Sequence, residues 1–168
     1  MLKSQASRVF VALGSNLSGN LDCPASQVIR GFQSIEQLPK TKLMNTSSLY
    51  QSAPFGYAAQ PDFINAVVEI STQLSPEALL EKLLIIEHEA GRERTFSNAP
   101  RVLDLDLLLY DDLILRTKNL TLPHPRMHER SFVLLPLAEI APELSLPTHG
   151  NVVKLAETYK NQDIKKLA

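Results

Sequence analysis

The chain has 168 residues, of which 44% are hydrophobic and 21% charged, and 17 basic against 18 acidic side chains give a net charge of −1. This length is typical of one domain with its own core, and the composition excludes a disordered tail or a coiled coil. A single cysteine excludes an internal disulfide framework, and the net charge indicates no general affinity for nucleic acid. No apolar run approaches the roughly 20 residues of a membrane span and no signal-peptide core is present, so we expect a cytoplasmic protein without a membrane partner.

The first half of the chain predicts a strand, a helix and two further strands. Residues 9–13 form a short apolar run that ends at a Gly-Ser-Asn sequence, which indicates a buried strand. Apolar residues spaced by three and four over residues 21–35 predict an amphipathic helix. Residues 42–50 are expected to form one strand, and a proline-containing loop separates it from a strand over residues 63–70.

The second half begins with a helix signal, because Ser75 is a good N-cap, Pro76 suits the first helical position and Gly91 ends the apolar pattern. A polar loop then leads to a strand over residues 102–110. A further helix is expected near residues 130–140, which Pro136 should kink or shorten. The order strand, helix, strand, strand, helix, strand predicts an α+β fold, a ferredoxin-like βαββαβ sandwich with its helices on one face and a C-terminal extension, in a single domain over residues 1–168.

Two aspartates stand on the strand predicted over residues 102–110. Alternate side chains of a strand share a face, so Asp104 and Asp106 should point the same way while the intervening leucines enter a core. Carboxylates about 7 Å apart raise each other's pKa unless a cation is present, and magnesium suits a site with few protein oxygens plus substrate phosphates. The alternative is a solvated edge strand whose charges prevent aggregation, and the pair alone does not decide between the two.

Arginines flank this pair on both sides, with Arg92, Arg94 and Arg101 before the strand and Arg126 and Arg130 after it. Guanidinium groups present paired donors that match phosphate oxygens, and arginines with a metal recur in phosphoryl transfer. Taken singly, each arginine is more simply a surface charge paired with a nearby glutamate. Together with the two aspartates they favour a polyphosphate site, and the absence of a Gly-x-x-x-x-Gly-Lys-Ser/Thr motif excludes a P-loop kinase.

Asn65 shares a strand face with apolar neighbours and could recognise a second ligand. Its amide offers a donor and an acceptor for the edge of a flat heterocycle, and Phe55, Phe63 or Phe132 could stack on the face of that ring. An asparagine that satisfies the neighbouring backbone is at least as common.

A non-catalytic regulatory or RNA-binding module of the same fold is the competing hypothesis for the whole chain. An RNA-binding sheet needs stacked aromatic residues on a basic surface, whereas this chain has 6% aromatic residues and a net charge of −1. A regulatory module has no need of paired aspartates beside several arginines. The residues therefore favour an enzyme.

Several ordered segments together resemble the 6-hydroxymethyl-7,8-dihydropterin pyrophosphokinase family of folate biosynthesis. The segments are ALGSNL at residues 12–17, YQSAPFG at 50–56, QPDFINA at 60–66, EHEAGRER at 87–94, PRVLDLDLL at 100–108, LPHPRM at 122–127 and PLAEIAPE at 136–143. The resemblance implies a single-domain ferredoxin-like enzyme that transfers the β,γ-pyrophosphate of ATP to the hydroxymethyl oxygen of the pterin and releases AMP.

The resemblance also implies roles for individual residues. It makes Asp104 and Asp106 catalytic ligands of two magnesium ions, and Arg92 and Arg101 catalytic arginines that engage the triphosphate of the co-substrate ATP. The positions that contact ATP are Glu87, Arg94, Leu107, Thr121, His124 and Arg130. The positions that hold the pterin are Ser52, Ala53, Phe55, Phe63, Asn65 and Phe132. We therefore expect a monomer whose partners are ATP and 6-hydroxymethyl-7,8-dihydropterin, with no nucleic acid and no membrane.

Overall fold

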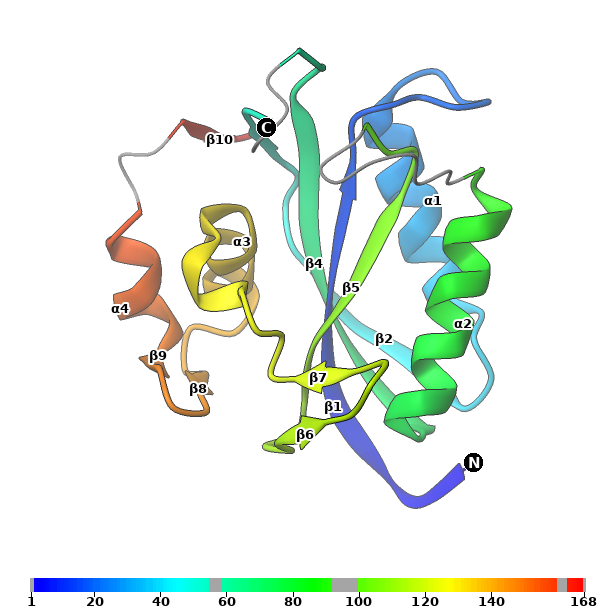
Figure 1. Ribbon diagram of the computed structural model, residues 1–168, viewed down its shortest axis with the longest axis vertical. Helices are drawn as coiled ribbons and strands as arrows, with labels where there is room; N and C mark the ends of the chain where they lie inside the picture. Colours follow the sequence, from blue (N-terminus) through cyan, green and yellow to red (C-terminus); the bar gives the residue numbers. More distant parts are fainter. Residues whose placement is uncertain (1, 55–58, 92–99, 160–162, 168) are drawn as a thin grey trace.

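The computed structural model describes residues 2–54, 59–91, 100–159 and 163–167 (Figure 1). The elements of its first half are β1 (Leu2–Ser15), α1 (Pro24–Glu36), β2 (Thr41–Thr46), β3 (Tyr50–Ser52), β4 (Phe63–Leu74) and α2 (Pro76–Glu89). The elements of its second half are β5 (Asp104–Tyr110), β6 (Leu115–Arg116), β7 (Thr121–Leu122), the 3₁₀ helix η1 (Met127–Glu129), α3 (Ser131–Ile140), β8 (Ser145–Leu146), β9 (Gly150–Asn151), α4 (Val152–Glu157) and β10 (Ile164–Lys166).

A six-stranded antiparallel sheet forms the centre of the fold, in the order β10-β3-β4-β1-β5, with β2 also paired to β4. Helices α1 and α2 cover one face of this sheet, and α3 and α4 cover the other (Figure 1). The prediction of an α+β fold is confirmed. The two helices between the strands lie on one face, as expected, and the C-terminal segment adds α3 and α4 on the second face and the edge strand β10.

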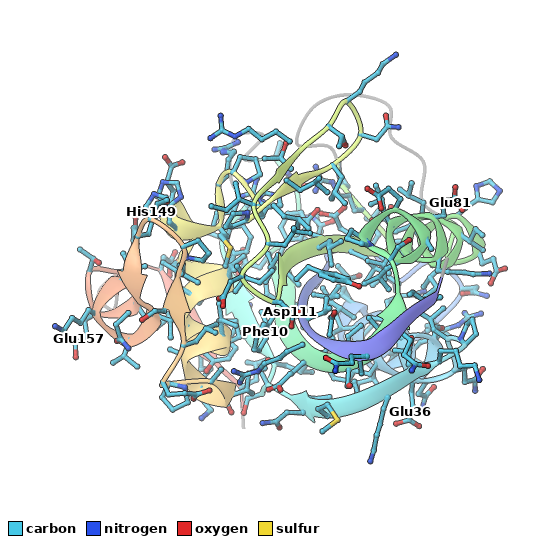
Figure 2. All side chains as sticks on the ribbon, turned by 90° about the horizontal axis from the view of Figure 1, so that it is seen from below. Phe10, Glu36, Glu81, Asp111, His149 and Glu157 are labelled. Carbon is cyan, nitrogen blue, oxygen red and sulfur yellow. The ribbon has the colours of Figure 1, made fainter. Side chains whose placement is uncertain are left out.

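The central strand β1 contributes to a hydrophobic core on each face of the sheet. Val11 and Leu13 belong to the core under α1 and α2, whereas Phe10 and Ala12 belong to the core under α3 and α4. Figure 2 shows Phe10 in the interior, while the exposed Glu81 of α2 lies at the periphery. Because both faces of β1 are covered at residues 9–13, this part of the strand is a continuous apolar run rather than an alternation of apolar and polar residues.

The helix boundaries agree with the signals in the sequence, except at Pro136. The Ser75 hydroxyl accepts the Ala78 N–H at 3.3 Å at the start of α2, and Gly91 follows the helix with φ +94°, a left-handed conformation that favours glycine. Helix α3 continues past the buried Pro136 to Ile140, so of the two expected effects of this proline, a kink or a shortening, the helix is not shortened. Proline removes one helical hydrogen bond at that point, and burial of the surrounding apolar side chains outweighs this loss.

The strand predicted over residues 42–50 is two strands, β2 and β3. Both pair with β4, but residues 47–49 between them oppose only residues 66–67 of β4. At this break the Ser47 N–H donates to the Val67 carbonyl and the Ser47 hydroxyl accepts the Val67 N–H, both at 2.9 Å. The extra residue is accommodated as in a β-bulge, with a side-chain oxygen in the place of a backbone carbonyl.

Strand β5 keeps the predicted alternation as far as Leu107. Asp104 and Asp106 face away from the core that buries Leu107 under α2. The pairing with β1 then shifts by one residue, so Leu108 and Leu109 both enter the core under α3. Two small hairpins, β6–β7 and β8–β9, lie outside the main sheet. In the described part of the chain no helix has the length and apolar character needed to cross a membrane.

Candidate active site

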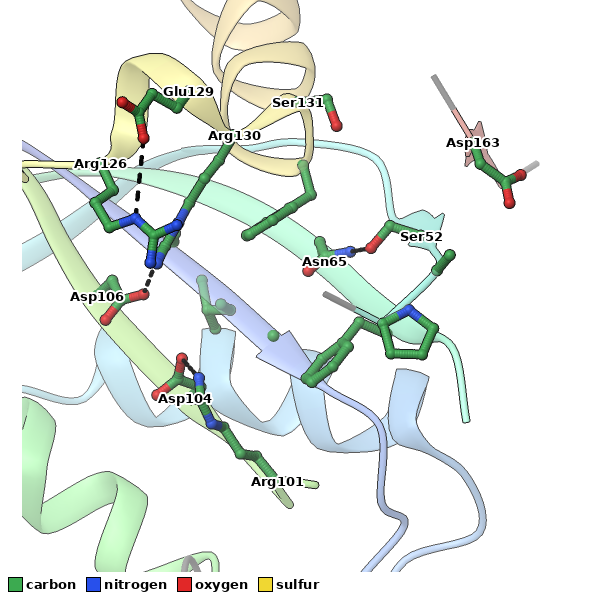
Figure 3. A pocket seen from close by; sticks show the side chains of 17 residues that line it. Ser52, Asn65, Arg101, Asp104, Asp106, Arg126, Glu129, Arg130, Ser131 and Asp163 are labelled. Carbon is green, nitrogen blue, oxygen red and sulfur yellow. Dashed lines mark hydrogen bonds and ion pairs between the residues drawn. The ribbon is translucent and has the colours of Figure 1, made fainter. Parts of the chain in front are cut away.

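A pocket of about 450 Å³ opens beside the start of α3, at the ends of β1, β4 and β5 (Figure 3). Six of its charged lining residues lie together and form what we call the charged end: Arg101, Asp104, Asp106, Arg126, Glu129 and Arg130. Ser52, Ala53, Pro54, Phe63, Asn65 and Asp163 form what we call the amide end, and Ala12, Leu13, Gly14, Ser131 and Phe132 complete the wall. In Figure 3 Asp104 and Asp106 lie on one side of the pocket and Ser52 and Asp163 on the other.

The register of β1 brings the two ends together. Gly14 pairs with Asn65 of β4 on one side and with Asp104 of β5 on the other. Ala12 pairs in the same way with Asp106. A Cβ atom at Gly14 would lie 3.4 Å from the Asn65 Oδ1, so glycine keeps this part of the floor clear. A ligand can therefore rest on two small residues between the amide and the carboxylates.

Each aspartate of the charged end has a guanidinium partner. Arg101 Nη1 lies 2.7 Å from Asp104 Oδ2, and Arg130 Nη1 lies 3.7 Å from Asp106 Oδ2. The Asp104 side chain is only 12% exposed, which argues against the solvated edge strand considered as the alternative. The charged end thus already holds the cations that two neighbouring carboxylates need.

The same carboxylates could also hold a divalent ion. Among the described residues no group of three or more His, Cys, Asp or Glu side chains is placed to bind a metal. Magnesium does not need such a group, since it keeps several waters and takes oxygens from phosphates. Two acidic side chains on one strand face, open to a pocket lined by arginines, fit that ion together with a phosphate ligand.

Arg130 and His124 lie next to the aspartates. Burial lowers the pKa of Arg130, whose guanidinium lies 5.6 Å from the centre of the Phe132 ring, but an arginine remains a cation at neutral pH. Burial, and then the positive charge of Arg130, lower the pKa of His124 to about 4. Its Nδ1 accepts the backbone N–H of Arg126 at 3.1 Å, so the neutral ring carries its proton on Nε2.

Asn65 dominates the amide end and is 4% exposed. Its Nδ2 donates to the Ser52 hydroxyl at 2.7 Å and lies 3.5 Å from the Tyr50 carbonyl. The amide nitrogen is therefore bonded to β3, as the alternative interpretation of this residue expected. The fixed amide still lines the pocket, and its Oδ1 is the atom that a Cβ added at Gly14 would approach most closely.

Most of the predicted site residues that the structure describes line this one pocket. These are Ser52, Ala53, Phe63, Asn65, Arg101, Asp104, Asp106, Arg130 and Phe132. Arg92, Arg94 and Phe55 lie outside the described residues. The side chains of Glu87, Leu107, Thr121 and His124 do not line the pocket.

Glu87 and Leu107 lie on the other side of β5. Glu87 is 3% exposed, and its Oε2 accepts the backbone N–H of Leu105 at 2.6 Å, which ties α2 to this edge strand. Leu107 is buried in the same core because the alternation that turns the aspartates toward the pocket turns it away. Thr121 lies in β7, opposite Arg116.

Sequence reasoning missed two charged residues of the lining, Glu129 and Asp163. Glu129 pairs with Arg126 at 3.9 Å within the turn of η1. Asp163 reaches the pocket because β10 pairs with β3, a contact between distant parts of the chain. An i,i+3 charge spacing could have indicated the first residue, whereas no local signal indicates the second.

Comparison with known proteins gives one consistent match. The model of the 7,8-dihydro-6-hydroxymethylpterin-pyrophosphokinase family matches residues 10–142. The 2-amino-4-hydroxy-6-hydroxymethyldihydropteridine pyrophosphokinase of Haemophilus influenzae is 44% identical over 158 residues, which cover 94% of this chain and 96% of that protein. The enzyme of the same name from Pseudomonas aeruginosa is 42% identical over 160 residues, 95% of this chain and 96% of that protein.

The fold also matches a solved structure, that of Plasmodium falciparum HPPK-DHPS. The TM-score is 0.73 with 15% sequence identity, over 92% of this chain and 46% of that chain. At this level of identity the match concerns the fold alone.

Proposed function

Because the chain belongs to the 7,8-dihydro-6-hydroxymethylpterin-pyrophosphokinase family, we propose that its pocket binds the two substrates of that reaction at its two ends. The protein is an ATP-dependent pyrophosphokinase of folate biosynthesis. It transfers pyrophosphate from ATP to the hydroxymethyl group of 6-hydroxymethyl-7,8-dihydropterin, which gives the pterin diphosphate and AMP. We assign the triphosphate to the charged end and the pterin to the amide end. The observation that carries this assignment is the pairing of Gly14 with both Asn65 and Asp104.

At the charged end, we assign Asp104 and Asp106 as the ligands of two magnesium ions. Magnesium bound there supplies neutralisation of the phosphate charge during transfer. Arg101 and Arg130 contact the same carboxylates, so these guanidinium groups can turn their donors to phosphate oxygens when the carboxylates bind the ions. Positioning and charge neutralisation suffice for a loose phosphoryl-transfer transition state, so no covalent intermediate on the protein is required.

At the amide end, the contact between Asn65 and Ser52 fixes which atom meets the ligand. Nδ2 is held by the Ser52 hydroxyl, so Oδ1 is left as the acceptor for an N–H group on the edge of the pterin ring. Phe63 and Phe132 line the same pocket and offer ring faces for stacking. The ring is thereby oriented with its hydroxymethyl group toward the charged end.

We also infer that the core is ferredoxin-like and that the whole chain makes one pyrophosphokinase domain. The antiparallel order β3-β4-β1-β5 with α1 and α2 on one face supports the first inference. The family match over residues 10–142 and the pairing of β10 with β3 support the second.

A turnover assay with ATP, magnesium and the pterin alcohol, with AMP as the product measured, tests the proposal. We expect AMP release to need all three components, to stop when a chelator removes the metal and to resume when magnesium is restored. Binding of ATP and pterin without AMP release would instead identify a non-catalytic ligand-binding module.

A further inference from the structure

The carboxylate of Glu139 connects three segments of the chain. From helix α3, its Oε1 accepts the backbone N–H of Ser48 at 3.0 Å and the hydroxyl of Tyr50 at 2.8 Å, and its Oε2 accepts the hydroxyl of Ser48 at 2.8 Å. The Nζ of Lys166, in β10, lies 3.7 Å from Oε2. Helix α3, the residues that enter β3, and β10 therefore meet at one side chain.

Each of these segments also contributes to the wall of the pocket. Helix α3 begins with the lining residues Ser131 and Phe132, β3 ends at Ser52, and β10 follows directly after Asp163. Glu139 comes seven residues after Phe132, so about 10 Å of rigid helix separates the carboxylate from the ring. If α3 moved relative to β3 at Glu139, the helix would carry Phe132 through nearly the same displacement and so change the shape of the pocket.

The break between β2 and β3 makes this contact possible. Ser47 forms both hydrogen bonds to Val67 of β4, so the next residue, Ser48, directs its N–H and its hydroxyl to α3 instead of the sheet. Glu139 belongs to the sequence segment 136–143, which contributes no lining residue in the described part of the chain. The bulge at Ser47 exposes the donors of Ser48, and the Glu139 carboxylate accepts from them. Segment 136–143 therefore has a structural contact with β3 although it does not line the pocket.

The protonation states at the contact are fixed at neutral pH. Burial alone would raise the pKa of Glu139, but the hydrogen bonds from Ser48 and Tyr50 outweigh it and hold the pKa below its usual value. Burial and the neighbouring carboxylate raise the pKa of Tyr50, which is 7% exposed. Glu139 therefore accepts and Tyr50 donates at neutral pH.

We propose that Glu139 is a positioning residue for the pterin, which sets the separation of the α3 wall from the β3 wall at the amide end. This inference rests on the proposed placement of the pterin between Phe132 and Asn65. Within the charged end, the two aspartates and Arg101 have their own support in the β1–β5 pairing and the contact between Arg101 and Asp104. Arg130, at the start of α3, is also paired with Asp106. Loosening α3 from β3 therefore weakens pterin binding and leaves ATP binding largely unchanged.

The test compares steady-state kinetics of Glu139→Gln and Tyr50→Phe with the parent protein, with ATP and the pterin alcohol varied in turn. Glutamine offers one acceptor oxygen and no charge, so we expect the KM for the pterin to rise about tenfold, because hydrogen bonds to a charged group are about twice as strong as neutral ones. Tyr50→Phe removes one of the donors and should raise it about threefold. The KM for ATP should stay within about twofold of the parent value in both variants. Glu143→Gln is the matched control, since Glu143 lies in the same segment but pairs with Arg8 at 2.9 Å, and it should leave both KM values unchanged.

Two results would overturn the inference. The first is an unchanged KM for the pterin in both Tyr50→Phe and Glu139→Gln. If Glu139→Gln fails to fold, an unchanged KM in Tyr50→Phe decides the question. The second is an equal rise in both KM values, which would show a structural role only. Asn65→Ala separates this inference from the proposed function. If Asn65→Ala, Glu139→Gln and Tyr50→Phe all leave the pterin KM unchanged, the placement of the pterin is wrong. If only Asn65→Ala raises it, the placement holds and the role of Glu139 is refuted.

Discussion

Replacement of Asp104 by asparagine should lower both the stability and the turnover of the protein. Asp104 Oδ2 lies 2.7 Å from Arg101 Nη1, and about 7 Å separates residues of like face on a strand, such as Asp106. Since Coulomb energy falls with distance, the attraction that is lost exceeds the repulsion that is relieved roughly 2.5-fold at equal dielectric constant.

The burial of the pair sets the expected size of the effect on stability. The two side chains are 23% and 12% exposed. The cost should therefore lie between the about 0–1 kcal/mol of a surface pair and the about 3–5 kcal/mol for breaking a buried one. We expect a loss of about 1–2 kcal/mol in the free energy of unfolding, or about 2–8 °C in melting temperature for a chain of this length. Loss of a metal ligand should lower turnover about a hundredfold or more.

Thermal unfolding without substrates measures the first effect, and AMP release at saturating ATP, pterin and magnesium measures the second. Asp112→Asn is the control, because Asp112 is exposed, lies just beyond β5 and does not line the pocket. It should change neither quantity. An Asp104→Asn protein as stable as the parent would refute the argument from charge, and near-normal AMP release would refute the metal assignment.

Three further predictions concern the neighbouring residues. Asn65→Ala should raise the KM for the pterin about tenfold and leave the KM for ATP unchanged in steady-state kinetics, and equal effects on both would contradict the assignment of the two ends. Glu87→Ala removes the carboxylate that accepts the Leu105 N–H, so urea denaturation should show a loss of about 1–3 kcal/mol in the free energy of unfolding. Calorimetry should show an unchanged affinity for ATP. Unchanged stability with weaker ATP binding would instead support a nucleotide contact. The pKa of His124 is lowered from 6.5 to about 4 by burial and by Arg130, so the unfolded chain takes up this proton at higher pH than the folded protein does. The stability that depends on His124 should be complete above pH 6.5 and be lost as the pH falls toward 4. His124→Gln should therefore flatten the dependence of unfolding free energy on pH in that window, and an unchanged slope would contradict the shift.

The parts of the structure that depend on neighbouring residues could be predicted from the sequence. The start of α2 follows from Ser75, and the shared face of Asp104 and Asp106 follows from the period of a strand. The break at Ser47 could not be predicted, because its hydroxyl accepts the Val67 N–H of β4 in place of a backbone carbonyl of its own strand, and a serine fits a regular strand equally well.

The parts that depend on distant contacts were missed. The second helical layer and Asp163 reach their places only through packing on the far face of the sheet and the pairing of β10 with β3. The resemblance assigns Glu87 to nucleotide binding, but it does not tell where the side chain points. In the structure the Glu87 carboxylate accepts the backbone N–H of Leu105, on the side of β5 away from the pocket. A motif identifies which residues occur together, whereas strand alternation and register determine which of them face the ligand.

The pairing of Gly14 with strands on both sides fixes the separation between the amide end and the charged end of the pocket. Neighbouring strands lie about 4.8 Å apart, so two steps place the backbone positions of Asn65 and Asp104 about 10 Å from each other. The backbone hydrogen bonds between the strands set this distance from Asn65 to Asp104. It does not depend on the length or sequence of the loops around the pocket. A slip of β5 along β1 by one residue would carry Asp104 about 3.3 Å along the strand and turn its carboxylate to the opposite face. Changes in the loops therefore leave the separation of Asn65 and Asp104 unchanged, and on the proposed placement of the two substrates they adjust affinity rather than the distance between the two binding sites.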